Sequence, residues 1–352
     1  MCLGLLLAML LAAAQTEYSK PSAPYVEENV SYANSDAPGV TLAGTFTEPR
    51  AGGPFPAVLL ITGAGPQDRD ETISGHKPFL VLADYLTRRG VAVLRVDDRG
   101  TAQSTGNFDG ATTQDFASDA EAGVRFLLSR SDVDAKHVGL IGHGEGAIIA
   151  PMVAVNVPQV SFLVLLAGTA VPGEDVLLAQ TEEAEAAAGI PDEQIEADER
   201  IGAALYRLVR AGKPEADLRE ALFNAPSSYR PFIEHWQRQL HHLESPWLRF
   251  FLSYDPAPTL EKVKCPVLAL DGERDTDVVP EQNIPAIRAA LKRGHNHDAT
   301  VRVLPDLNYM FESVKASAEY KSAPETMSAV ALDLIASWIE KHTITERATE
   351  RN

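Results

Sequence analysis

Residues 137–151, HVGLIGHGEGAIIAP, hold the first pattern in this chain that could do chemistry. An apolar, strand-like run ends at Gly142, and a helix-like run begins at Gly146. A turn of the form G-x-S-x-G lifts a nucleophilic serine hydroxyl above the edge of a sheet. Here Gly144 stands at the centre of the turn, where no side chain can form a covalent intermediate. The spacing therefore predicts a nucleophile turn that lacks its nucleophile.

The elements that must position this turn alternate between buried strands and amphipathic helices. Continuous Val, Ile and Leu runs separated by helical patterns indicate a mostly parallel sheet that is covered on both faces. Residues 24–48 instead alternate in polarity around SDAPG, which predicts an antiparallel hairpin. Thr112 or Thr113 is the expected N-cap of the helix that follows the second core strand. The expected strand segments lie at 54–61, 91–100, 137–142, 161–168, 265–275 and 299–307, and a final helix is expected at 324–342.

A helical insertion interrupts this order. Residues 172–258 contain helix-forming runs with no strand between them, and we interpret them as a lid over the sheet. The predicted organisation is a signal peptide at 1–15, a first core part at 16–171, this lid, and a second core part at 259–345. The lid's aromatic residues are expected to form its own core, although they could also wall a pocket: Trp236, Trp247, Phe250 and Phe251.

Composition limits the partners and the location of the protein. The net charge of −18 repels phosphate backbones and anionic lipid, so we expect no nucleic-acid partner. No cysteine follows the small residues near the start of the sequence, so we also expect no membrane anchor there. The apolar run that opens the chain is too short to cross a bilayer and ends in small residues, which is typical of a signal peptide. We therefore expect a secreted or periplasmic protein, or a cytoplasmic one if the segment is not a working signal. Oligomeric state stays open.

Several further segments complete a family resemblance. They are LLITGAGPQDRDE, GHKPFLVLADYLTRRG, LRVDDRG, STGNF, FFLSYDPAPTLEKVKCPVLALDGERD and VLPDLNYMF. With GHGEGAIIAP they make the chain similar to bacterial serine esterases of the α/β-hydrolase superfamily, in the branch of the dienelactone hydrolases and serine aminopeptidases. The resemblance covers nearly everything after the first segment. It implies an α/β-hydrolase fold, a helical lid and an ancestral carboxylic-ester hydrolysis.

The resemblance also assigns positions to the site. Members of the family read G-H-S-E-G at the turn and L-N-H near the end. Gly144 then takes the nucleophile position, Asp275 the acid position and Tyr309 the base position. The backbone N–H groups of Ala64 and Glu145 would form the oxyanion hole.

Two of these three catalytic positions are therefore changed. Glycine cannot form an acyl intermediate, and tyrosine, with an ordinary pKa near 10, is a poor base at neutral pH. Loss of one triad member can cost about 10⁶-fold in rate, whereas the oxyanion hole and binding retain about 10³-fold over water. We predict that serine-esterase turnover is nearly abolished.

Other side chains offer little replacement. His143 is expected to pack beside the turn, Ser104 and Thr105 lack a base, and Cys265 is expected to be a small buried hydrophobe. The pair His241 and His242 is expected on a helix face, and the pair His295 and His297 in a solvated loop. We expect no metal and no cofactor. Asp68, Arg69 and Asp70 are expected to form a polar network that shapes the oxyanion hole.

These observations favour a catalytically impaired hydrolase homologue that still binds a small ester or acyl ligand. Two alternatives stay open. One is an active carboxylesterase that uses a non-standard nucleophile. The other is a non-hydrolytic enzyme in which Tyr309 donates a proton or a hydrogen bond to an oxyanion.

Overall fold

A computed structural model describes residues 24–225, 230–314 and 326–349. The predicted signal segment lies outside these residues. Within them, no helix combines the length and the apolar character that a membrane crossing requires.

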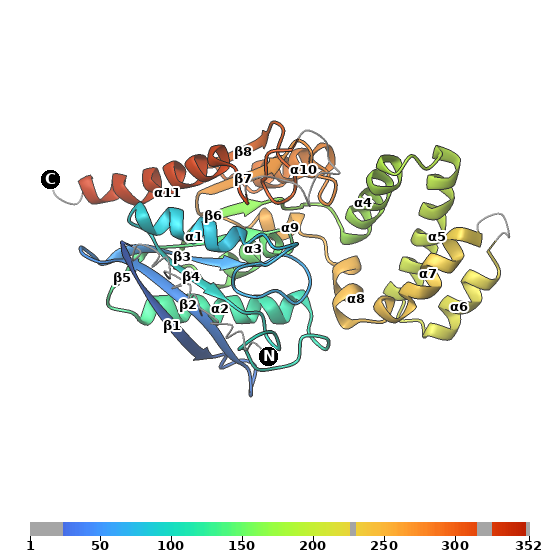
Figure 1. Cartoon of the computed structure of the whole chain (residues 1–352), viewed down its shortest axis with the longest axis horizontal. Helices are drawn as coiled ribbons and strands as arrows, with labels where there is room; N and C mark the ends of the chain where they lie inside the picture. The colour runs from blue at the N-terminus through green and yellow to red at the C-terminus, as the bar shows by residue number, and fades with distance from the viewer. Residues whose placement is uncertain (1–23, 226–229, 315–325, 350–352) are drawn as a thin grey trace, which may run out of the picture.

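The centre of the fold is an eight-stranded sheet in the order β1-β2-β4-β3-β5-β6-β7-β8 (Figure 1). The predicted hairpin is confirmed, because β1 and β2 pair in antiparallel register, and β2 continues antiparallel onto β4. All the remaining pairs are parallel, as the apolar runs predicted. The strands are β1 (Tyr25–Ala33), β2 (Thr41–Pro49), β3 (Phe55–Ile61), β4 (Ala92–Val96), β5 (Val133–His143), β6 (Val160–Leu166), β7 (Val267–Gly272) and β8 (Ala299–Leu304).

Helices cover both faces of the sheet, so each strand contributes alternate side chains to two separate cores. Leu59, for example, packs toward α2 and α3, whereas its neighbours Val58 and Leu60 pack toward α1 and α11. These covering helices are α1 (Pro78–Arg88), α2 (Thr113–Ser129), α3 (Gly146–Asn156), α9 (Ala257–Leu260), α10 (Pro280–Arg293) and α11 (Ala329–Thr349).

Two helix starts follow from capping chemistry. Thr112 is the N-cap of α2 and forms a capping box with Asp115, which selects it over Thr113. The last helix begins at Ala329, later than the Pro324 start that the sequence pattern predicted. Its start is set by Ser328, whose N–H donates to the Phe311 carbonyl and whose hydroxyl accepts from the Val330 N–H.

Five helices between β6 and β7 form a helical lobe beside the sheet-containing body (Figure 1). Trp236 lies in the core of this lobe, where its indole N–H donates to Asp198 at 2.7 Å. The lobe comprises α4 (Gly173–Ala187), α5 (Asp192–Arg210), α6 (Glu215–Phe223), α7 (Arg230–Leu243) and α8 (Pro246–Ser253).

Candidate active site

The turn between β5 and α3 has the close strand-to-helix approach that its glycines predicted. A β-carbon at Gly142 would overlap the backbone of Gly146, and one at Gly146 would overlap the carbonyl of Ile61 on β3. Between them, Gly144 has a φ of +52°, a left-handed conformation that strains residues with a side chain. The turn therefore keeps the shape that presents a nucleophile, and glycine adopts its central conformation without strain.

Tyr309 fills the space above the turn. A β-carbon at Gly144 would overlap the Tyr309 hydroxyl, and a β-carbon at Gly63 would lie 2.9 Å from the same oxygen. The hydroxyl thus sits between the two glycines that precede Ala64 and Glu145. Burial raises the pKa of Tyr309 well above its ordinary value, and the charge of Glu71 raises it further. The phenol is therefore a hydrogen-bond donor and not a base at neutral pH.

His143 holds Tyr309 in this position. Its Nε2 lies 3.0 Å from the Tyr309 carbonyl oxygen, and because a carbonyl only accepts, Nε2 carries the proton. Its ring also packs against the Tyr309 ring at an interplanar angle of 37°, with centroids 4.2 Å apart. Its Nδ1 lies 2.9 Å from Glu71 Oε1. Burial would lower the pKa of His143, but the charge and the hydrogen bond of Glu71 raise it above its ordinary value. Both ring nitrogens are engaged, which fits the predicted packing role.

Glu71 joins this pair to the expected oxyanion hole. Its side chain is fully buried, its φ is +53°, and its Oε1 also accepts the Gly63 N–H at 2.7 Å. Strained backbone at a non-glycine residue persists only where the surroundings hold it, and such residues cluster at functional sites. Glu71 therefore fixes Gly63, and with it the following Ala64 peptide, relative to His143.

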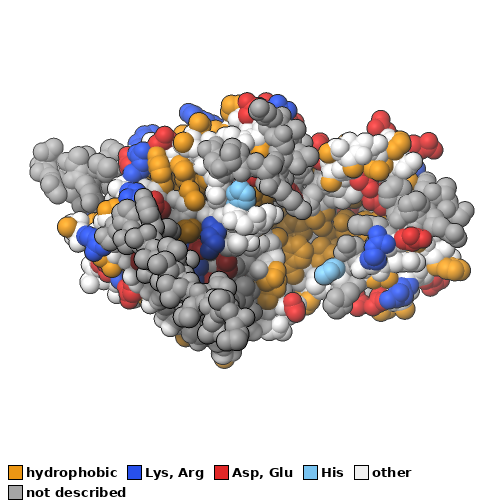
Figure 2. All heavy atoms as spheres, viewed as in Figure 1, with side chains coloured by type: hydrophobic (Ala, Val, Ile, Leu, Met, Phe, Trp, Pro, Cys, Tyr) orange, Lys and Arg blue, Asp and Glu red, His pale blue; other side chains and the backbone are white. Residues whose placement is uncertain are grey.

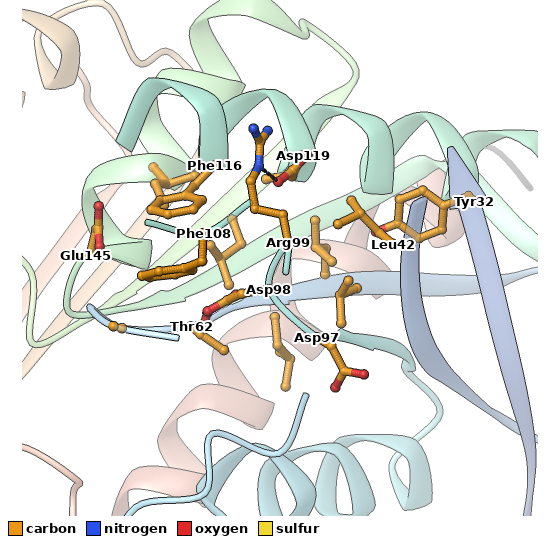
Figure 3. A pocket seen from close by; sticks show the side chains of 18 residues that line it. Tyr32, Leu42, Thr62, Asp97, Asp98, Arg99, Phe108, Phe116, Asp119 and Glu145 are labelled. Atoms are coloured by element: carbon orange, nitrogen blue, oxygen red, sulfur yellow. Dashed lines mark hydrogen bonds and ion pairs between the residues drawn. The ribbon is translucent and has the colours of Figure 1, made fainter. Parts of the chain in front are cut away.

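The rest of the loop 62–67 is held by Asp98, which follows β4. One carboxylate oxygen accepts the Thr62 hydroxyl at 2.7 Å, and the other accepts the Gln67 N–H at 2.8 Å. Burial raises the pKa of Asp98 to about 8. Thr62 and Asp98 line a small cavity of about 50 Å³, next to the Arg99–Asp119 ion pair (Figure 3). That cavity has room for little more than water, so we do not place an acyl ligand there.

The expected polar network of residues 68–70 is present and braces the same loop. Arg69 pairs with Asp97 at 2.6 Å, Asp70 pairs with Arg95 and Lys77, and Asp68 accepts the backbone N–H of Asp70 at 3.0 Å.

Glu145 connects the turn to the helical lobe. Its buried Oε1 accepts the Thr113 hydroxyl from α2 and the Trp247 indole N–H from α8, both at 2.7 Å. Burial raises the pKa of Glu145, and these two hydrogen bonds lower it in part. The backbone N–H groups of Glu145 and Ala64 donate no hydrogen bond to any described residue. They are thus free to bind a carbonyl oxygen, as an oxyanion hole requires.

Asp275 lies on the loop after β7, and no basic side chain among the described residues pairs with it. Its Oδ1 accepts the N–H groups of Asp277 and Val278 at 2.7 and 2.9 Å, and no described histidine reaches its buried Oδ2. Burial raises the pKa of Asp275 to about 7. Its titrating neighbour is Asp271, whose pKa is raised well above its ordinary value by burial and by the charge of Asp275. The acid position is therefore present without an imidazole to orient.

A cavity of about 310 Å³ is lined by the loop 62–67, by the turn at Gly144 and by the loop that follows β7. Gly144, Tyr309 and Ala64 lie along it with Glu145, and α4 and α8 of the helical lobe contribute apolar walls. In Figure 2, hydrophobic side chains line the hollow between the lobe and the body. Trp247 and Phe251 wall the cavity, unlike Trp236, which belongs to the core of the lobe.

The other candidate residues lie elsewhere or are already bound. The Ser104 hydroxyl donates to the Asp97 carbonyl and accepts the Ala43 N–H, so it ties a loop to β2. Burial raises the pKa of Cys265 to about 11, which leaves it a thiol. His295 and His297 line a groove with Arg288 and Lys292 along β8. In the described part of the chain, no three potential ligands cluster around a metal-sized space.

Sequence reasoning missed two connections at this site. Glu71 directly follows the Asp68–Asp70 segment, but its pairing with His143 spans 72 residues of the chain. The Trp247–Glu145 hydrogen bond spans an even longer separation. The position of Glu71 directly after an aspartate-rich loop was the available signal for its pairing with His143. Nothing local in the sequence indicated the Trp247–Glu145 hydrogen bond.

The sheet order, the turn geometry and the position of the free N–H groups define an α/β-hydrolase. The family described as X-Pro dipeptidyl-peptidase (S15 family) matches residues 38–301, and the chain belongs to this family. Esterase EstD of Thermotoga maritima is 27% identical over 338 residues, which cover 94% of this chain and 72% of that protein.

Solved structures agree on the fold. An esterase of Pyrococcus furiosus superposes with a TM-score of 0.57 at 15% identity, covering 90% of each chain. Dienelactone hydrolase from Anabaena variabilis superposes with a TM-score of 0.51 at 15% identity, covering 90% of this chain and 98% of that one. The predicted resemblance to esterase-like α/β-hydrolases is therefore confirmed.

Proposed function

We propose that this protein is a catalytically impaired hydrolase homologue that retains an esterase-like pocket and binds small acyl compounds. The observation that carries the proposal is the position of the Tyr309 hydroxyl, which occupies the space that a side chain at Gly144 would need. The nucleophile is thus missing, and the room for it is filled. Serine at 144 and tyrosine at 309 exclude each other on steric grounds.

The retained half of the site supports binding. The N–H groups of Ala64 and Glu145 face the same cavity, and its 310 Å³ volume lies at the lower end of the range for small-molecule pockets. Asp275 has kept its backbone hydrogen bonds but has no imidazole to orient. Without a base, a water molecule in this cavity lacks an activating group at the triad position.

Hydrolysis of p-nitrophenyl acetate tests this proposal. We expect the protein itself to show no turnover above the solution background. The double variant Gly144→Ser/Tyr309→His restores both missing groups and removes the steric conflict, so we expect a gain of about 10³-fold or more. Each single variant should stay inactive, because one lacks a base and the other a nucleophile. Turnover by the unmodified protein at the rate of the double variant would contradict the proposal.

A further inference from the structure

Three hydrogen-bond donors meet at one end of the cavity. The Tyr309 hydroxyl lies between Gly63 and Gly144, and the next peptide N–H groups along the chain are those of Ala64 and Glu145. None of the three donates a hydrogen bond within the described ranges, and all three residues line the cavity. Such a cluster of unpaired donors fits an oxygen atom with accessible lone pairs, as in a carbonyl or a carboxylate.

The charges around these three donors favour a carbonyl oxygen over a carboxylate. Glu71, Glu145 and Asp277 line the cavity, which has no lysine or arginine among its lining residues. Asp275 stands close enough to act on the Tyr309 hydroxyl through its charge. His143, whose ring contacts that of Tyr309, is already paired with Glu71. A carboxylate ligand would have to leave water for a site whose neighbours carry its own sign of charge.

Much of the remaining lining of the cavity is apolar and aromatic. The rings of Trp247 and Phe251 stack with centroids 5.1 Å apart and an interplanar angle of 13°. Val176 and Leu177 on α4 and Ile148 on α3 complete this wall. The wall offers a flat aromatic surface, on which the ring of a ligand can pack by offset stacking or edge to face.

We propose that the cavity binds uncharged aryl carbonyl compounds, such as esters and amides, and excludes the corresponding carboxylates, with Tyr309 as a specificity-determining hydrogen-bond donor. This proposal rests on the proposed function, since it names which acyl compounds the pocket takes. An ester or amide oxygen accepts the three hydrogen bonds without bringing a charge. The carboxylate that hydrolysis would release can accept the same hydrogen bonds but brings a negative charge into the cavity. The pocket therefore retains an intact ester or amide rather than its product.

Phenylacetamide and phenylacetate form a matched pair of probes, because they have nearly the same shape and differ in charge. Calorimetric titration of the protein near neutral pH should show phenylacetamide binding at least about tenfold more tightly. Tyr309→Phe should weaken phenylacetamide about three- to tenfold, as expected for one lost hydrogen bond. Tyr85→Phe, which removes a hydroxyl outside the cavity on α1, should leave both affinities unchanged and serves as the control.

Asp277→Asn sharpens the electrostatic part of the proposal. It removes one lining charge while an amide oxygen can still accept from Gln180, whose Nε2 lies 2.8 Å from Asp277 Oδ1. We expect phenylacetate to gain affinity in this variant and phenylacetamide to change little. Phenylacetate binding as tightly as the amide would overturn the selectivity and leave acyl binding intact. An amide affinity that is unchanged in Tyr309→Phe would overturn the role of Tyr309. If neither probe binds up to about 10 mM, acyl binding itself fails.

Discussion

The loop 62–67 and the loop that carries Asp275 face the same cavity, yet they have been kept to different degrees. Glu71 and Asp98 accept three hydrogen bonds from the first loop, and Tyr309 is fixed over it by His143. Asp275 accepts the N–H groups of Asp277 and Val278 on its own loop and interacts with the carboxyl group of Asp271 on β7, and its buried Oδ2 reaches no described base. Under the proposed function, the half of the site that would hold a carbonyl oxygen is retained, whereas the half that would attack the carbonyl carbon is not.

This contrast shows which groups the fold needs and which the reaction needs. The hydrogen bonds around Gly63 and Glu145 also join β3, β4, α2 and the helical lobe, so their loss would disturb packing as well as binding. Under the proposed function, the groups that Gly144 and Tyr309 replace are needed by the reaction and not by the sheet.

The largest loss of stability is expected at the turn between β5 and α3, on which both halves of the site depend. Gly146→Ala would drive a β-carbon into the Ile61 carbonyl on β3, and backbone on both sides prevents relief. Overpacking of a rigid core commonly costs 1–3 kcal/mol and occasionally more, and a backbone overlap belongs to the upper end. We expect urea denaturation to show a loss of about 3 kcal/mol or more.

Gly110→Ala is the matched control for this variant. A β-carbon there meets only the amide end of the exposed Asn107 side chain, which can turn away. Its unfolding free energy should change by less than about 0.5 kcal/mol. An equally mild effect at Gly146 would mean that the strand and helix do not approach as closely as described.

The second effect tests the steric exclusion between positions 144 and 309. Gly144→Ser alone should lower the free energy of unfolding by about 2–3 kcal/mol, because it adds left-handed strain and overlaps the Tyr309 hydroxyl. In a Tyr309→His background the overlap is relieved, so Gly144→Ser should lower the free energy of unfolding by at least about 1 kcal/mol less than it does in the unmodified protein. Thermal or urea unfolding of all four proteins gives this coupling. Additive effects would show that the hydroxyl does not occupy the nucleophile space.

Much of the fold could be predicted because its signals are local. Continuous apolar runs such as Val58–Ile61 identified the parallel strands, and alternation over residues 24–48 identified the hairpin. The start of the last helix was misplaced, because Ser328 depends on the Phe311 carbonyl of a distant loop for its position. Local pattern predicts an element better than it predicts where the element ends.

For the site, the sequence could assign positions along the chain but no contacts. Family motifs placed Gly144, Asp275 and Tyr309 along the chain, but a motif contains no distance. That Tyr309 points its hydroxyl between two glycines follows from the contact of its ring with the His143 ring and from the hydrogen bond that His143 donates to its carbonyl. Those contacts join residues more than a hundred positions apart, and no local periodicity encodes them.

The third effect is a pH dependence of stability that comes from Asp275 and its neighbour Asp271. Burial raises the pKa of Asp275 from 3.8 to about 7, so the folded chain binds this proton more tightly than the unfolded chain does. The resulting stabilisation is complete below pH 3.8 and is lost as the pH rises through about 7. Asp275→Asn removes this titration and should flatten the decline.

Denaturant unfolding of both proteins across that pH window measures the difference. We expect about 1–2 kcal/mol, less than the whole pKa change would give at about 1.4 kcal/mol for each pH unit, because the adjacent Asp271 shares the titration. Parallel stability curves for the two proteins would show that Asp275 is not a buried proton-binding group.

The smallest effect on stability is expected at the residue that matters most for ligand binding. The Tyr309 hydroxyl makes no hydrogen bond to the described residues, whereas the Tyr309 carbonyl and ring are held by His143. Tyr309→Phe keeps the carbonyl and the ring, so the free energy of unfolding should change by less than about 0.5 kcal/mol. His143→Ala, in contrast, removes the group that fixes the ring and leaves Glu71 buried without its partner, at a cost of about 3 kcal/mol or more. A large loss in Tyr309→Phe would mean that the hydroxyl serves the fold, and it would remove the reason for assigning it to a ligand.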